Sequence, residues 1–211
     1  MAELWYPGAE KLPGPARKTS GTSWPKKGIV LHSAEGSWPG FKNVLMARDG
    51  GSWHFSNLKD GRLYQHYPLD AVTWHARGGN TDNGGMEHEG KAGEPLTEPQ
   101  IANAANVIAW AKKVCEWGEL SRTEPGQNLW EHNEIGLLNN YVTACPSRRI
   151  PWARIMLLAE KEEKMLQELD KRLKQGGVIA AVMAKALAGA PLTQAERDLS
   201  IGVIQGMPVK D

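Results

Sequence analysis

The feature that most constrains the fold is a short apolar run, Gly28-Ile29-Val30-Leu31, that ends in His32. A continuous apolar run of this length is typical of a strand that is buried on both faces, so we expect residues 27–33 to form the central strand of a sheet. His32 then lies where the buried strand passes into a loop. The run therefore indicates a layered fold and marks one edge of the sheet as a place where polar side chains can meet.

Periodic patterns on either side of this strand predict the other elements. Thr97 and Gln100 form a capping box at the start of the clearest helix, and an Asp60-Gly61 pair predicts a hairpin turn. The expected strands are residues 27–33, 52–57, 62–67 and 86–90, and the expected helices are residues 41–48, 97–117 and 151–174. Strands interleaved with helices favour an α/β fold with a mixed central β-sheet covered by helices.

The chain divides into three predicted parts. Residues 1–26, rich in Pro, Gly and Lys, suggest an N-terminal arm laid over the surface without regular structure. Residues 27–175 form the main domain with its long final helix, and residues 176–211 form a short helical C-terminal module. This module packs on the main domain, binds the cell wall, mediates self-association or forms a short amphipathic piece that disturbs membranes.

Composition narrows the possible partners and the compartment. Lys+Arg 25 against Asp+Glu 24 leaves a formal net charge of +1, so no overall field favours binding to nucleic acid. Two cysteines are too few for a secreted disulfide framework. The uncharged stretch at 176–184 is shorter than the ~18 residues that a membrane span needs, so we expect no stable membrane insertion. The opening residues show no secretory signal, which predicts synthesis in the cytoplasm.

The segment 131–146, with the sequence EHNEIGLLNNYVTACP, carries the chemistry. It places His132 and Cys145 in what we expect to be one irregular segment. His and Cys are zinc ligands, and His32 at the end of the central strand supplies a plausible third. Because zinc with three protein ligands and an open fourth position is the catalytic arrangement, we predict a hydrolytic Zn²⁺ site.

Six short motifs in register resemble a known family. They are Leu31-His32-Ser33, Trp53-His54-Phe55, Trp74-His75-Ala76, Gly85-Met86-Glu87-His88-Glu89-Gly90, His132-Asn133-Glu134-Ile135 and Thr143-Ala144-Cys145-Pro146. Their order, over residues 27–160, resembles that of type-2 N-acetylmuramoyl-L-alanine amidases. That family includes phage endolysins and is related to peptidoglycan recognition proteins. The resemblance implies a zinc hydrolase that cuts the amide bond between N-acetylmuramic acid and L-alanine in bacterial peptidoglycan.

The resemblance also implies roles for individual residues. His32, His132 and Cys145 are the expected metal ligands, Glu87 is the expected general base, and Thr143 is the expected donor to the oxyanion. Residues expected to meet substrate are Trp53, His54, His75, Arg77 and Asn83. For His54 and His75, support of the ligands or of the cavity wall is an equal alternative.

Two functions remain open from the sequence. The first is a phage-type endolysin that acts on the bacterial cell wall after release by a separate lysis system. The second is a non-catalytic peptidoglycan-binding module of the recognition-protein type. The three candidate ligands favour the enzyme, because such binders lose them.

Overall fold

The computed structural model describes residues 4–174 and residue 189. Its main sheet has six strands in the order β1-β5-β4-β7-β3-β8, and a second sheet pairs β2 with β6. The strands are β1 (Glu10–Lys11), β2 (Thr19–Thr22), β3 (Gly28–Ser33), β4 (Phe55–Asn57), β5 (Leu63–Gln65), β6 (Ala71–Thr73), β7 (Asn83–His88) and β8 (Leu129–Glu131). The helices are α1 (Trp38–Met46), α2 (Glu98–Val114), α3 (His132–Leu138) and α4 (Trp152–Lys174), with two 3₁₀ turns at Ala16–Lys18 and Arg77–Gly79.

Strand β3 runs parallel to β7 on one side and to β8 on the other. All six of its residues are buried, as its apolar sequence predicts. The β4–β5 hairpin is antiparallel, whereas β4 joins β7 in parallel. The prediction of a mixed sheet covered by helices is therefore confirmed.

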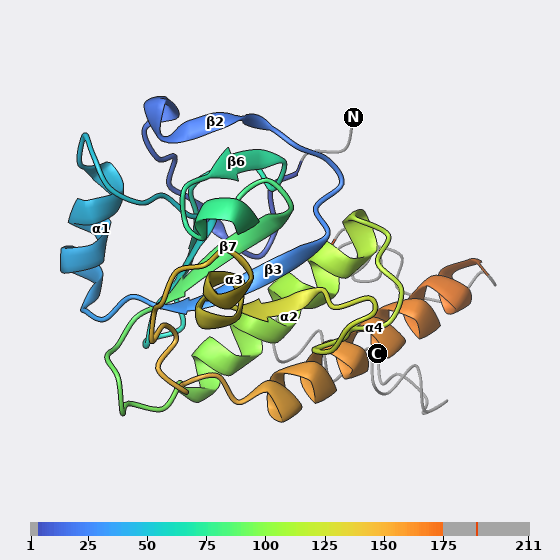
Figure 1. The fold of residues 1–211 in the computed structure, drawn as a ribbon. Helices are drawn as coiled ribbons and strands as arrows, with labels where there is room; N and C mark the ends of the chain where they lie inside the picture. Colours follow the sequence, from blue (N-terminus) through green and yellow to red (C-terminus); the bar gives the residue numbers. More distant parts are fainter. Residues whose placement is uncertain (1–3, 175–188, 190–211) are drawn as a thin grey trace.

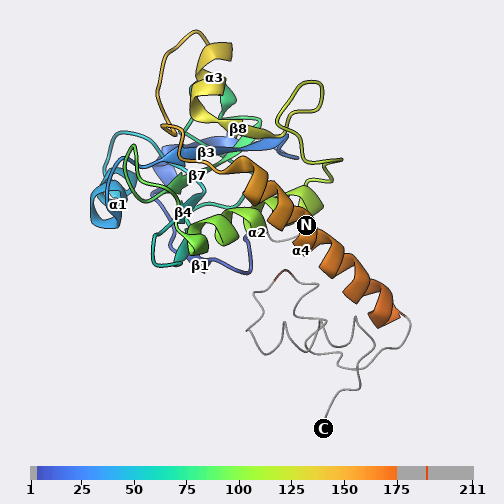
Figure 2. The ribbon, with the colours of Figure 1, turned by 90° about the horizontal axis from the view of Figure 1, so that it is seen from below.

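Helices α2 and α4 cover one face of the sheet (Figure 1). The predicted capping box of α2 is present, because the Thr97 side chain accepts from the Gln100 backbone and the Gln100 side chain accepts from that of Thr97. Ile101 and Ile108 of α2 pack with Ile29 of β3 in the largest core cluster. In Figure 2, α4 continues away from the sheet beyond the part that lies beside α2. Burial of apolar side chains between these layers is the main force that holds the fold together.

The short helix α3 covers the opposite face of the sheet (Figure 2). Its Ile135 packs with Val30 of β3 and with Ala76 in a separate small cluster. The sequence-based expectation of an irregular segment is wrong here. A seven-residue helix is too short to show a clear apolar period, and its Glu131/Glu134 capping box lacks the usual Ser or Thr.

Two further differences from expectation concern strands. The N-terminal arm contains β1, which pairs with β5, and β2, which pairs with β6, so it is partly regular. Strand β7 begins at Asn83, within a stretch predicted as loop, and includes Gly84 and Gly85. Glycine weakens strand propensity, but it is needed here because a Cβ at Gly85 would lie 2.5 Å from Cγ of His75.

The predicted module at residues 176–211 lies outside the described residues, apart from Gly189. The prediction of self-association through it therefore remains a prediction. Among the described residues, no helix has the length and apolar character needed to cross a bilayer.

Candidate metal centre

His32 stands near the carboxyl end of β3, with its ring on the face of the sheet that α3 covers. Side chains alternate along the strand, so Ile29 and Leu31 enter the core beneath α2 while Val30 and His32 take the other face. His32 is 1% exposed. Burial is the main cause that holds the pKa of its imidazole well below the usual value. The ring is therefore neutral at pH 7 and has a lone pair to offer a metal ion.

His132 and Cys145 come from either end of the segment that contains α3. His132 is the first residue of the helix, and Cys145 lies in the loop that follows it. The backbone N–H of Asn133 donates to the carbonyl oxygen of Cys145 at 2.8 Å, which closes this segment on itself. Although the segment is helical rather than irregular, it brings the imidazole and the sulfur together as expected.

The three side chains converge on one point. His32 Nδ1 lies 3.7 Å from Cys145 Sγ, and the His32 and His132 ring centroids are 4.6 Å apart. One ligand atom from each residue lies within 4.8 Å of the others, and the described part of the chain contains no other such group. Ligand atoms of tetrahedral zinc, bound at about 2.0–2.3 Å, lie about 3.5 Å from one another. Only a small contraction separates the cluster from that geometry.

The surroundings of the Cys145 sulfur act on its ionisation in opposite directions. The backbone N–H of Ser33 donates to Cys145 Sγ at 3.2 Å. Burial, and then the nearby Glu87, raise the pKa of the Cys145 thiol. A divalent cation between the ligands would oppose this shift, because its charge favours the thiolate. The donor set of two imidazoles and one sulfur therefore fits zinc and leaves a fourth position open.

Glu87 lies beside His32 on the neighbouring strand, because the two residues are partners in the parallel register of β3 and β7. Glu87 Oε1 is 3.8 Å from His32 Nδ1, and Oε2 is buried without a hydrogen-bond partner. Burial, and then the charge of Glu35, raise the pKa of Glu87 to about 8. A carboxyl group that titrates near neutral pH beside a candidate metal site is suited to proton transfer.

A cavity of about 410 Å³ opens beside His132. Its lining includes the predicted residues His75, Arg77 and Thr143, together with Trp74, Asn80, His132, Tyr141 and Val142. The Thr143 hydroxyl accepts the backbone N–H of Cys145 at 3.2 Å, so its own proton is available to donate elsewhere. The guanidinium of Arg77 lies over the Tyr141 ring, 4.5 Å from its centroid. The cavity therefore lies beside the candidate metal centre and is lined in part by predicted site residues.

Trp53 and His54, both predicted to bind substrate, do not line this cavity. Trp53 is 4% exposed, and its Nε1 donates to Ser56 Oγ at 2.8 Å. His54 is fully buried, with Nε2 3.0 Å from the carbonyl oxygen of Ala71 and Nδ1 3.0 Å from the backbone nitrogen of Gly85. Their burial does not support direct contact of Trp53 with a substrate, and for His54 it favours the predicted alternative, support of the ligands or of the cavity wall. Both residues belong to motifs that resemble those of the family, but their side chains are buried inside the protein.

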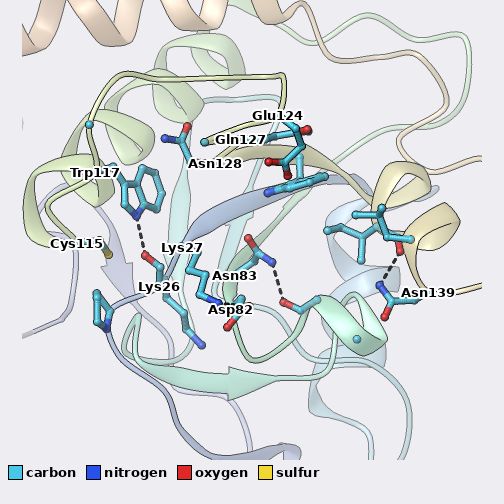
Figure 3. Close-up of a pocket in the computed structure, with 18 residues that line it drawn as sticks. Lys26, Lys27, Asp82, Asn83, Cys115, Trp117, Glu124, Gln127, Asn128 and Asn139 are labelled. Atoms are coloured by element: carbon cyan, nitrogen blue, oxygen red, sulfur yellow. Dashed lines mark hydrogen bonds and ion pairs between the residues drawn. The ribbon is translucent and has the colours of Figure 1, made fainter.

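Asn83 is also away from the candidate metal centre. It begins β7, at the opposite end of the strand from Glu87, and lines a second cavity of about 630 Å³ (Figure 3). Its Nδ2 donates to the carbonyl oxygen of Gly79 at 3.0 Å. Its Oδ1 is buried and has no hydrogen-bond partner. The prediction that Asn83 meets substrate at the metal site is therefore corrected.

Sequence reasoning missed Arg149, which holds the segment after Cys145 in place. Arg149 is 5% exposed, and its guanidinium donates to Ser33 Oγ at 2.8 Å and to the carbonyl oxygens of Glu94 at 2.7 Å and Glu89 at 2.9 Å. These contacts join the loop to β3 and to the end of β7. No local pattern could have identified Arg149, because most of its partners are backbone oxygens distant in sequence.

Comparison with known proteins places the chain in a family. The profile of the N-acetylmuramoyl-L-alanine amidase family matches residues 23–148, which is more than half of the 211 residues. The chain therefore belongs to this family of peptidoglycan amide hydrolases, as the sequence motifs predict. No curated protein sequence matches it.

Solved structures share the fold at low identity. A selenomethionine derivative of AmpD has 20% sequence identity, with a TM-score of 0.61 over 75% of this chain and 98% of that one. The catalytic domain of XlyA has 20% identity, with a TM-score of 0.55 over 72% of this chain and 99% of that one. A mutant endolysin from Bacillus subtilis has 19% identity, with a TM-score of 0.54 over 72% and 98%.

Proposed function

We propose that this protein is a zinc-dependent N-acetylmuramoyl-L-alanine amidase that cleaves the amide bond between N-acetylmuramic acid and L-alanine. The observation that carries the proposal is the convergence of His32, His132 and Cys145, with one ligand atom from each within 4.8 Å of the others. Membership of the amidase family identifies the reaction, and the ligand cluster is the candidate metal site for it. His32, His132 and Cys145 would hold the zinc ion, which would supply polarisation of the carbonyl group and a bound water with a pKa of about 7.

Glu87 is the general base in this proposal. Its Oε1 lies 3.8 Å from His32 Nδ1, on the side of the ring that also faces Cys145. The carboxylate takes the proton of the attacking water and passes it to the amine that leaves. A nearby cation favours the ionised form of Glu87, which the buried site alone disfavours.

Thr143 and the residues around the 410 Å³ cavity bind the substrate in this proposal. The Thr143 hydroxyl, which accepts from the backbone of Cys145, donates its proton to the oxyanion that forms on the attacked carbonyl. Arg77, held over the Tyr141 ring, pairs with a carboxylate of the stem peptide. His75 forms part of the wall.

We infer the biological setting from the endolysins among the structures to which this chain is similar. We assign the protein to the phage-type endolysins, which degrade the bacterial cell wall in host lysis. Its partner is then bacterial peptidoglycan, reached after synthesis in the cytoplasm and release to the wall.

The test combines metal analysis with product analysis. Purified protein is expected to contain about one zinc per chain, and digested peptidoglycan is expected to release stem peptides with a free L-alanine amino group, identified by mass spectrometry. Removal of zinc by a chelator should abolish the release, and added zinc should restore it. Cleavage at a glycosidic bond would contradict the proposal. Binding to peptidoglycan without cleavage, with or without zinc, would instead support the recognition module.

A further inference from the structure

His75 stands directly behind the candidate ligand His32. It lies two residues beyond β6 and is 8% exposed, and its ring meets that of His32 edge to face with centroids 5.2 Å apart. His75 Nδ1 is 3.0 Å from His32 Nε2. His75 contributes no atom to the metal cluster itself.

The second nitrogen of His75 determines the direction of this hydrogen bond. Its Nε2 lies 3.2 Å from the backbone carbonyl oxygen of Asn83. A carbonyl oxygen can only accept, so this nitrogen carries the proton, and Nδ1 of the neutral ring is left as the acceptor. His32 Nε2 must then be the donor. A neutral His32 that is protonated at Nε2 has its lone pair at Nδ1, the atom 3.7 Å from Cys145 Sγ.

We propose that His75 is a positioning residue that holds His32 in the tautomer whose Nδ1 is free to bind the metal. The proposal rests on the proposed function, because it takes His32 to be a zinc ligand. In metalloproteins the ring nitrogen opposite the metal commonly donates to a carboxylate, a carbonyl or water. Here the ring of a second histidine takes that place, and Asn83, at the start of β7, orients it through its backbone.

The fold holds the His75 ring in place without help from a metal. The backbone N–H groups of His75 and Ala76 donate to Asn80 Oδ1 at 3.0 Å and 2.6 Å. The absence of a side chain at Gly85 leaves room for the ring, since a Cβ there would lie 2.5 Å from His75 Cγ. The acceptor for His32 is therefore built before any ion binds.

The experiment reads the tautomer of His32 directly. Long-range ¹H–¹⁵N NMR of the metal-free protein is expected to show His32 protonated at Nε2 and bare at Nδ1. In His75→Leu, which removes the acceptor, the Nδ1-protonated form of His32 should become populated. In His75→Asn, whose side-chain oxygen can replace Nδ1 as acceptor, the wild-type tautomer should largely return. His66→Gln, a change at a buried histidine that does not contact His32, is the matched control and should leave the spectrum of His32 unchanged.

Zinc affinity provides the second readout. Loss of an outer hydrogen-bond partner typically weakens metal binding about 10–100-fold. By competition with a chromophoric chelator, His75→Leu is expected to bind zinc within that range more weakly, with partial recovery in His75→Asn. A thermal melt establishes that each variant is folded. If His75→Leu does not fold, the tautomer of His32 in the wild-type protein decides whether the proposal holds.

The outcomes separate this proposal from the proposed function. A wild-type His32 protonated at Nδ1 would overturn the role of His75, even if the protein binds zinc and cleaves peptidoglycan. Unchanged tautomer and zinc affinity in folded His75→Leu would also overturn it. Conversely, the expected tautomer in a protein that binds no zinc would support the role of His75 in orienting His32 and contradict the proposed function.

Discussion

Two groups of histidines differ in role: one belongs to the candidate metal centre, and the other packs inside the protein. In the first group, His32 and His132 lie with Cys145 in the candidate metal cluster, where one ligand atom from each residue lies within 4.8 Å of the others. In the second group, His54 and His66 use both ring nitrogens within the protein. For example, His66 Nε2 lies 2.8 Å from Ser56 Oγ, and His66 Nδ1 lies 2.7 Å from the carbonyl oxygen of Leu12.

The difference shows that burial and a lowered pKa do not identify a functional histidine. Burial is the largest cause of the lowered pKa in both groups. What separates them is the kind of partner that the ring nitrogens meet. In the packing group both nitrogens meet hydroxyl or backbone groups, as His66 does, whereas Nδ1 of His32 faces the sulfur of Cys145, another candidate ligand. A nitrogen that faces other candidate ligands is available to a metal ion, whereas one held by the fold stabilises the protein.

The two cysteines divide between a ligand role and a packing role in the same way as the histidines, and the largest effect is expected from them. Cys145→Ser is expected to lower zinc affinity by more than about 100-fold, because loss of a ligand should exceed the loss of an outer partner, and amidase activity should fall with it. Cys115, buried in the core of α2 and α4, is the matched control. Cys115→Ala should retain zinc and activity. Metal analysis and an amidase assay check both, and zinc retained by Cys145→Ser would break the comparison.

Glu87→Gln should separate turnover from metal binding. The amide keeps the shape of the side chain but cannot act as a base, so kcat is expected to fall about 10²–10⁴-fold while zinc content is unchanged. Glu89→Gln, two residues along, is the control. Its carboxylate accepts from the backbone of Trp38 and of Lys59, so turnover should stay close to that of the wild type. Full activity in Glu87→Gln would require another base.

His66→Leu should affect stability alone. The substitution leaves Ser56 and the carbonyl oxygen of Leu12 without their partner, which is expected to cost about 1–3 kcal/mol in the free energy of unfolding. Zinc content should be unchanged. Denaturant unfolding at pH 7.5 measures the cost, and a loss of zinc at unchanged stability would show that the packing group also supports the metal.

The smallest expected effect is the pH dependence that His66 contributes. Burial lowers the pKa of His66 to about 4 in the folded protein, below the unfolded value near 6.5. The unfolded chain therefore binds the extra proton between these values, so the stabilisation is present above pH 6.5 and is lost as pH falls toward 4. Between pH 7.5 and 5.5, the stability difference between wild type and His66→Leu should shrink by about 1 kcal/mol. A difference that grows on acidification would contradict this assignment.

Much of the fold could be predicted because its elements carry local signals. The apolar run of β3 and the capping box of α2 each identify an element from residues close together in sequence. The parts that were missed lack such signals. The predicted strand at residues 86–90 omitted the start of β7, because Asn83-Gly84-Gly85 resembles a loop. Helix α3 is only seven residues long.

The candidate site also contains residues that the sequence predicts and residues that it does not. His32, His132 and Cys145 were predicted as ligands from residue type and position, and the structure brings them together. Trp53 and Asn83 were expected at the site and lie elsewhere, because the direction of a side chain depends on the neighbours against which it packs. Arg149 was not foreseen, since its partners come from distant segments.

The amino-acid sequence by itself determined the family, the layered α/β architecture and the set of side chains able to bind zinc. These follow from residue types at particular positions, which need no knowledge of contacts. Only the tertiary structure decided which histidines face other candidate ligands and which ring nitrogen of His32 faces Cys145. Those properties depend on hydrogen-bond partners such as His75 and the carbonyl oxygen of Asn83, which reach the site only when the strands assemble.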